Sequence, residues 1–183
     1  MSLHGWGASA QNLASVVPLL NLPEYQFMFP DAPFPHPYSS IGRAWYDLSG
    51  NKGQGLPESR KLLTDWLLSL ESTTGVPLSR TILSGFSQGA AMTLDVGLSL
   101  PLAGLIALSG YLHPLAGSVA HTSTPVLILH GRQDSIVPLK AAESARDTLK
   151  GLGMSVQYQE FDMGHEIRPE VLAVIREFVI GLT

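Results

Sequence analysis

The sequence predicts an α/β fold in which helices cover both faces of a mostly parallel sheet. Short apolar runs bounded by Gly or Pro alternate with segments whose apolar residues recur at helical spacing. Strands that alternate with helices in this way are typical of parallel sheets. The chain has 183 residues, 45% hydrophobic and 14% charged, which is long and apolar enough for a single domain over 1–183.

The first part of the chain is expected to hold two helices, a strand and a long loop. The first helix covers 8–20, and a short strand at 25–29 stops at a proline. The segment 31–55 is rich in Pro, Gly and aromatic residues and is expected to be a loop. The second helix covers 57–73 and starts with a proline, whose missing N–H costs nothing in the first turn. Its apolar face is expected to carry Leu62, Leu63, Trp66, Leu67 and Leu70.

The rest of the chain continues the alternation. Strands are expected at 81–84, 102–109, 125–130 and 156–161. Helices are expected at 90–98, 139–152 and 166–181. Catalytic groups on a parallel sheet belong at the carboxyl ends of its strands, so polar residues directly after a strand are the candidates for a site.

The composition excludes several function classes. The net charge is −4 and no Lys/Arg cluster exists, so nucleic acid is not expected as a partner. The chain has no cysteine, which excludes disulfides, thiolate metal sites and a cysteine nucleophile. No apolar run approaches the roughly 18 residues of a membrane span, so membrane insertion is not expected. The expected location is cytoplasmic. The sequence does not indicate an oligomeric state.

The predicted nucleophile is Ser87. The strand at 81–84 leads into Gly-Phe-Ser-Gln-Gly at 85–89, which matches the pattern G-x-S-x-G. A serine that stands clear of a sheet needs a sharp strand-to-helix turn, and Gly85 and Gly89 then come too close for side chains. A surface serine in an ordinary turn is the alternative. The strand before the motif and the helix after it are the context that favours the nucleophile, since the helix start also stabilises negative charge.

The predicted base is His165. With this motif the reacting groups follow in the chain order serine, acid, histidine. Of the six histidines, His113 and His121 precede any suitable acid, and His130 ends a buried strand where it is expected to pack. His165 lies between the last strand and the last helix, from where it can reach the nucleophile. An exposed helix cap is the alternative role.

Three carboxylates compete for the role of orienting His165, and Asp134 is the predicted acid. Asp31 precedes Ser87, which breaks the expected order. Asp162 shares a short loop with the histidine and would move with it. Asp134 lies just past the carboxyl end of a different strand, and a rigid strand positions a carboxylate better than a loop does.

The start of the chain offers an oxyanion hole. Residues 3–7 read Leu-His-Gly-Trp-Gly, and a glycine-rich turn between a strand and a helix exposes backbone N–H groups. The N–H of Trp6 is the candidate donor there, together with the N–H of Gln88 after the nucleophile.

These motifs resemble the phospholipase/carboxylesterase family of α/β-hydrolases, which includes acyl-protein thioesterases and small bacterial carboxylesterases. The matching segments lie at 3–7, 29–33, 45–47, 85–89, 108–110, 130–134, 137–138 and 164–167. The resemblance implies an α/β-hydrolase fold and an esterase that needs no metal and no cofactor. It also implies short- and medium-chain acyl esters as substrates and, in some members, lysophospholipids or S-acyl proteins.

Two features depart from the family pattern. The family usually has a glycine after the Gln-Gly of the nucleophile motif, where this chain has Ala90, which is expected to lie inside the helix. Family members also carry one or more strands before the His-Gly turn. Here only Ser2 and Leu3 precede it in the strand, so the N-terminal strands are expected to be shortened or missing.

The predicted function is a serine carboxylesterase acting on a small acyl ester through a Ser-His-Asp triad. A lysophospholipase or an acyl-protein thioesterase on the same triad is the alternative, because the motifs do not define the acyl pocket. A non-catalytic binding protein and a peptidase are less favoured, since all three triad residues are present and the resemblance indicates esters. Five aromatic residues in loops could line the substrate pocket or could pack the long loop on the sheet: Trp6, Phe34, Tyr38, Trp45 and Tyr46.

Overall fold

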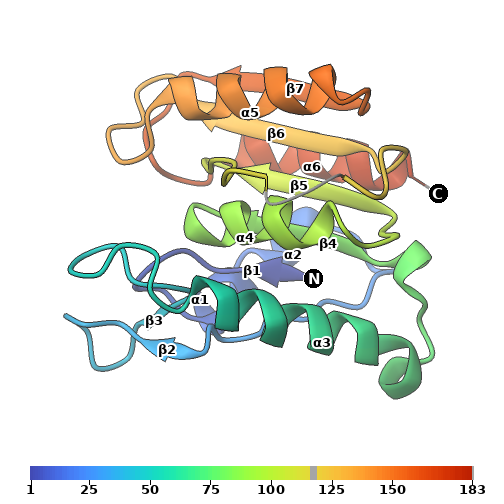
Figure 1. Cartoon of the computed structure of the whole chain (residues 1–183). Helices are drawn as coiled ribbons and strands as arrows, with labels where there is room; N and C mark the ends of the chain where they lie inside the picture. The colour runs from blue at the N-terminus through green and yellow to red at the C-terminus, as the bar shows by residue number, and fades with distance from the viewer. Residues whose placement is uncertain (116–118, 183) are drawn as a thin grey trace.

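A computed structural model describes residues 1–115 and 119–182 and contains a sheet of five parallel strands in the order β1-β4-β5-β6-β7 (Figure 1). The strands are β1 (Ser2–Leu3), β4 (Ile82–Phe86), β5 (Gly104–Leu108), β6 (Val126–Gly131) and β7 (Val156–Phe161). β5 and β6 are buried along their whole length, which explains their unbroken apolar sequences. The predicted α/β-hydrolase fold is confirmed, and β1 is only two residues long.

Helices pack on both faces of the sheet (Figure 1). The helices are α1 (Ala10–Ala14), α2 (Val17–Leu20), α3 (Leu56–Thr74), α4 (Gln88–Gly97), α5 (Leu139–Gly151) and α6 (Pro169–Ile180), with a short 3-10 helix at Leu78–Arg80. One hydrophobic core contains side chains of α3, α4 and α5, and a second one contains those of α6. None of the helices in the described ranges has both the length and the apolar composition needed to cross a bilayer.

The segment 8–20 forms two short helices, so the prediction of a single helix is wrong. Pro18 lies in the first turn of α2. A proline has no N–H to donate to the carbonyl four residues earlier, here that of Ala14, and its ring crowds that carbonyl. The chain therefore turns after α1 and starts a new helix.

The long helix α3 is close to its predicted range, but its apolar face is narrower than expected. Leu63, Leu67 and Leu70 are buried at a spacing of four and three residues, which places them on one stripe of the helix. Leu62 was expected on the same face and is 47% exposed, because it lies one residue outside that stripe. A stripe of this width is enough to pack α3 against α4.

The segment 31–55 is irregular, as predicted, apart from a small antiparallel hairpin of β2 (Phe34–Pro35) and β3 (Arg43–Ala44). The guanidinium of Arg43 connects the hairpin to the preceding turn, since it donates to the carbonyl oxygens of Ala32 and Pro33 at 2.9 and 2.8 Å. The hairpin and its loops lie at the edge of the sheet where β4, β5 and β6 end (Figure 1).

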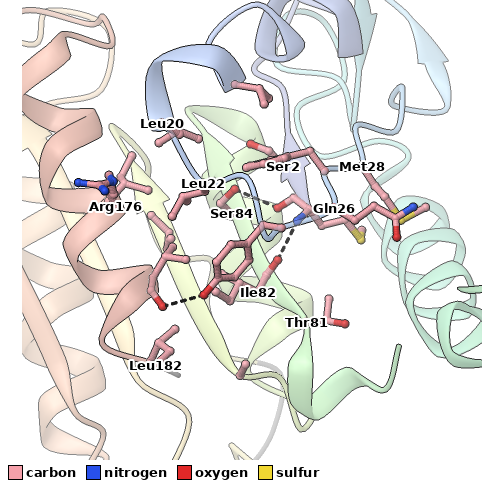
Figure 2. A pocket seen from close by; sticks show the side chains of 18 of the residues that line it. Ser2, Leu20, Leu22, Gln26, Met28, Thr81, Ile82, Ser84, Arg176 and Leu182 are labelled. Carbon is pink, nitrogen blue, oxygen red and sulfur yellow. Dashed lines mark hydrogen bonds between the residues drawn. The ribbon is translucent and has the colours of Figure 1, made fainter. Parts of the chain in front are cut away.

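The strand predicted at 25–29 does not form. This segment makes one hydrogen bond to β1, from the Ser2 N–H to the Met28 carbonyl at 3.0 Å, and β1 is too short for a longer ladder. Its other side borders an apolar cavity of about 990 Å³ beside β4 and α6. Figure 2 shows side chains that surround this cavity. At its border the Met1 ammonium donates to the Ile82 carbonyl at 2.9 Å. A strand needs a neighbour, and the sequence pattern alone does not show whether one is present.

Candidate active site

The turn from β4 into α4 places Ser87 in a strained backbone conformation. Its φ and ψ are 55° and −119°, a region that residues other than glycine rarely adopt. The flanking glycines are required by close backbone contacts. A Cβ on Gly85 would lie 2.2 Å from the carbonyl oxygen of Gly89, and a Cβ on Gly89 would lie 2.1 Å from that of Leu3. The steric argument made from the motif therefore applies, and Ser87 stands at the carboxyl end of β4.

His165 and Asp134 are joined by a short hydrogen bond, in which the ring Nδ1–H donates to Oδ2 at 2.7 Å. The Asp134 side chain is fully buried, and its other oxygen accepts the backbone N–H groups of Ile136 and Val137 at 2.9 and 2.8 Å. Burial raises the pKa of this carboxyl, but the hydrogen bonds from His165 and the two backbone groups outweigh burial and hold the pKa below its usual range. Asp134 is therefore a carboxylate at neutral pH.

The loop that carries His165 is held against the end of β6. A Cβ on Gly131 would lie 2.3 Å from the Met163 carbonyl oxygen, so the two backbones are in direct contact. The ring of His165 packs on that of Phe86, the residue before Ser87, at 4.8 Å between centroids. Because Nδ1 is engaged by the acid, Nε2 is the nitrogen available to take a proton. Within the described residues the Ser87 hydroxyl makes no hydrogen bond, which is common in a substrate-free site.

The competing carboxylates have other partners. Asp162 is 79% exposed at its side chain and accepts from the Arg132 guanidinium at 2.7 Å. Asp31 accepts the backbone N–H of Ala10 at 2.8 Å and is 54% exposed. Of the three candidates only Asp134 contacts His165, which is the pairing predicted from the sequence.

The two candidate oxyanion donors flank the serine. The N–H groups of Trp6 and Gln88 donate to no other group in the part of the chain that the structure describes. The turn at 3–7 passes close to Ser87, since a Cβ on Gly5 would lie 3.2 Å from the Cβ of Ser87. Trp45 holds this turn, because its indole N–H donates to the His4 carbonyl at 2.9 Å. Both N–H groups are thus free to bind an anion.

Sequence reasoning missed the role of the Gln88 side chain. Its amide lies fully buried, accepts the Trp45 N–H at 2.9 Å and donates to the Tyr46 carbonyl at 2.8 Å. These two bonds connect the start of α4 to the segment around Trp45, which holds the turn at 3–7. The signal in the sequence was a long polar side chain at a position where the helix start is buried, and it could have been noticed beside the Trp-Tyr-Asp motif at 45–47.

Of the five loop aromatics, two pack the long loop on the sheet, two line a small cavity and one is exposed. Trp45 and Tyr46 are buried and pack the long loop on the sheet. Trp6 and Phe34 line a small cavity of about 280 Å³ beside the hairpin. Tyr38 is 77% exposed at the hairpin tip.

A polar cluster lies beneath the loop that follows β5. The hydroxyl of Tyr46 contacts the hydroxyl of Tyr111 and lies 2.9 Å from the Nε2 of His113. The Nδ1 of His113 lies 3.5 Å from Asp95, which pairs with the Arg60 guanidinium. The described residues contain no group of three or more His, Cys, Asp or Glu side chains arranged to hold a metal ion.

A profile of the phospholipase/carboxylesterase family matches residues 1–182 of the chain. The protein belongs to this family. The relatives include acyl-protein thioesterase 1 of Gibberella zeae, 30% identical over 96% of this chain and 83% of its own length, and that of Neurospora crassa, 31% identical over 97% and 83%. Among solved structures, esterase PE8 superposes with a TM-score of 0.88 at 29% identity, covering 100% of this chain and 91% of the other. Arabidopsis thaliana SOBER1 gives 0.84 at 25% identity, covering 99% and 96%. The protein is accordingly an enzyme, a hydrolase of the serine esterase type.

Proposed function

We propose that this enzyme is a carboxylesterase that hydrolyses short- to medium-chain acyl esters with Ser87 as nucleophile, His165 as base and Asp134 as the orienting acid. The observation that carries the proposal is the 2.7 Å hydrogen bond between His165 and a fully buried Asp134, on a ring that packs beside the nucleophile turn. An exposed helix cap would not be anchored in this way. The roles follow from what each group can do chemically.

In the first half of the reaction the Ser87 oxygen attacks the carbonyl carbon of the ester, and its proton passes to His165 Nε2. The carbonyl oxygen becomes an oxyanion that the N–H groups of Trp6 and Gln88 stabilise. Asp134 stabilises the imidazolium by accepting its Nδ1–H. When the tetrahedral intermediate collapses, the bond to the alcohol oxygen breaks and His165 returns the proton to the leaving alcohol.

The second half repeats these steps with water as nucleophile. His165 takes a proton from the water, which attacks the acyl-serine, and the same two N–H groups hold the second oxyanion. Collapse then breaks the acyl–Oγ bond, His165 protonates Ser87, and the carboxylic acid leaves. Each cycle consumes one water and leaves the enzyme unchanged.

The proposed preference for shorter acyl groups follows the family, whose profile is that of phospholipases and carboxylesterases. A cavity of about 280 Å³ lies beside the turn at 3–7, with Trp6 and Phe34 in its lining, and is slightly smaller than the roughly 300 to 1,000 Å³ of typical small-molecule pockets. An acyl-protein thioesterase is the second candidate, because two relatives at 30% and 31% identity carry that name. Rates on a series of acyl esters of increasing chain length, beside matched thioesters and a lysophospholipid, separate the two. A thioester preference at long chain length would favour the second candidate.

The test of the nucleophile uses a fluorophosphonate probe, which reacts with activated serines. We expect one labelled site per chain, and we expect Ser87→Ala to abolish both labelling and ester hydrolysis. Ser84→Ala is the matched control, since Ser84 lies three residues earlier on β4 and its hydroxyl bonds, among the described residues, only to the Met1 carbonyl, at 2.9 Å. Labelling or hydrolysis that persists in the Ser87 variant would rule out the proposed mechanism.

A further inference from the structure

A second imidazole lies close to the acid of the proposed triad. His130 is in β6, four residues before Asp134, and is completely buried. Its Nε2 lies 2.8 Å from the carbonyl oxygen of Val137 and 3.4 Å from Oδ2 of Asp134. A carbonyl oxygen only accepts hydrogen bonds, so Nε2 must carry the hydrogen. Nδ1 is buried and has no partner among the described residues.

The Nε2–H of His130 stabilises the loop that carries Asp134. Val137 accepts from His130 through its carbonyl and donates its own N–H to Oδ1 of Asp134 at 2.8 Å. The two bonds connect the imidazole to the carboxylate through a single residue. The buried end of β6 thereby determines where the loop turns back and where its two N–H groups, from Ile136 and Val137, meet the carboxylate.

Nε2 of His130 also lies near the oxygen that His165 uses. Oδ2 of Asp134 accepts from His165 at 2.7 Å and lies 3.4 Å from the His130 Nε2. The two imidazoles differ in how firmly they are held. His130 is on a strand and fully buried, whereas His165 is on a loop with 16% of its side chain exposed. Through its hydrogen bond to the Val137 carbonyl, the strand imidazole therefore gives the Asp134 loop a fixed support beside the more exposed loop histidine.

We infer that His130 is a positioning residue for the proposed triad: its Nε2–H, held by β6, fixes the Asp134 loop through Val137 and so keeps Oδ2 within reach of His165. The inference rests on the proposed function of Asp134 and His165. His130 itself touches neither substrate nor nucleophile, so it acts through Asp134 alone. A buried histidine that merely fills space would need no donor at this position.

The test compares two substitutions. In His130→Gln the side-chain amide can place an N–H near the position of Nε2, whereas His130→Leu has similar bulk and no donor. We expect the Leu variant to lose about 10- to 100-fold in kcat with little change in KM, by analogy with the loss of the residues that orient ligand side chains at metal sites. The Gln variant should recover most of that loss. Rates are compared at equal folded fraction, and His130→Met replaces the Leu variant if that one does not fold.

Two further measurements separate positioning from packing. The Nδ1 proton of His165, bonded to Asp134, should give a low-field NMR signal that moves or disappears in the Leu variant and remains in the Gln variant. In an Asp134→Asn background, His130→Leu should cost little more, because the residue through which it acts is already disabled. Equal losses for Leu and Gln with an unchanged signal, or a full additional loss in the Asn background, would overturn the inference. If Asp134→Asn and Ser87→Ala stay active in parallel assays, the proposed function has failed instead.

Discussion

Replacing Asp134 by Asn tests the assignment of the acid most directly. The amide oxygen of Asn can still accept the N–H groups of Ile136 and Val137, which Oδ1 accepts at 2.9 and 2.8 Å. The amide nitrogen then takes the place of Oδ2 and presents a donor to His165 Nδ1, 2.7 Å away. Nδ1 must become the acceptor, so the ring hydrogen moves to Nε2. A histidine in this tautomer has no free nitrogen to take the proton of the nucleophile.

The expected loss follows from that tautomer. We expect turnover to fall by about 10³- to 10⁴-fold, as it does when the triad aspartate of a serine protease is replaced by asparagine. This loss corresponds to about 4 to 5.5 kcal/mol of transition-state stabilisation. The two backbone hydrogen bonds remain, so the fold should persist with about 1 kcal/mol less stability. The assay is kcat on a soluble short-chain ester, with the folded fraction measured by circular dichroism on the same samples.

Two matched substitutions provide the controls. Asp162→Asn removes a carboxylate that is 79% exposed and paired with Arg132, so turnover should change little. Asp31→Asn replaces the charged acceptor of the Ala10 N–H by a neutral amide oxygen, so any effect should fall on stability and not on turnover. A crippled Asp162 variant beside a nearly normal Asp134 variant would refute the reasoning.

Two more predictions concern stability. Gly89→Ala should destabilise the fold by several kcal/mol, because the added Cβ would lie 2.1 Å from a backbone carbonyl of β1. Gly151→Ala is the control and should be neutral or stabilising, since its added Cβ would have nothing within 4 Å. The melting temperatures of the two variants check this prediction, and equal values would contradict it. Asp95→Asn should lower the free energy of unfolding by about 1 to 2 kcal/mol at pH 7. Burial raises the pKa of Asp95, but His113 and Arg60 outweigh burial and hold it below the usual range. Its stabilisation is therefore present above the unfolded-state pKa of about 3.9 and is lost as pH falls through the lower folded value. Urea titrations from pH 7 to 3 measure the free energy of unfolding of the wild type and of the Asp95→Asn variant, and the two values should converge as the pH falls. A difference that stays constant with pH would show that the charge of the Asp95 carboxylate is not responsible.

The sequence was sufficient where a structural feature depends on neighbouring residues along the chain. The range predicted for β7 agrees with the structure, and those for β4, β5 and β6 differ by a few residues at their ends. The clash that excludes a side chain at Gly85 is equally local, because it arises from Gly89, four residues away, whereas the clash at Gly89 arises from Leu3 on the neighbouring strand. The break at Pro18 could also be predicted from the sequence, since the missing N–H is a property of the residue itself. Apolar residues at helical spacing do not offset that missing hydrogen bond.

Features that depend on distant parts of the chain were decided by the tertiary structure. The segment 25–29 has the composition of a strand, but a strand needs a partner with a free edge, and β1 offers only two residues. Asp134 and Asp162 both follow strands. The ends of β6 and β7 lie side by side, so Arg132 after β6 pairs with Asp162 after β7, and His165 bonds to Asp134. The two hydrogen bonds of the Gln88 side chain join it to Trp45 and Tyr46, which lie 43 and 42 residues away in the chain. Local sterics and hydrophobic spacing thus determined the elements and the nucleophile turn, whereas the packing of strands and loops decided which polar groups meet at the site.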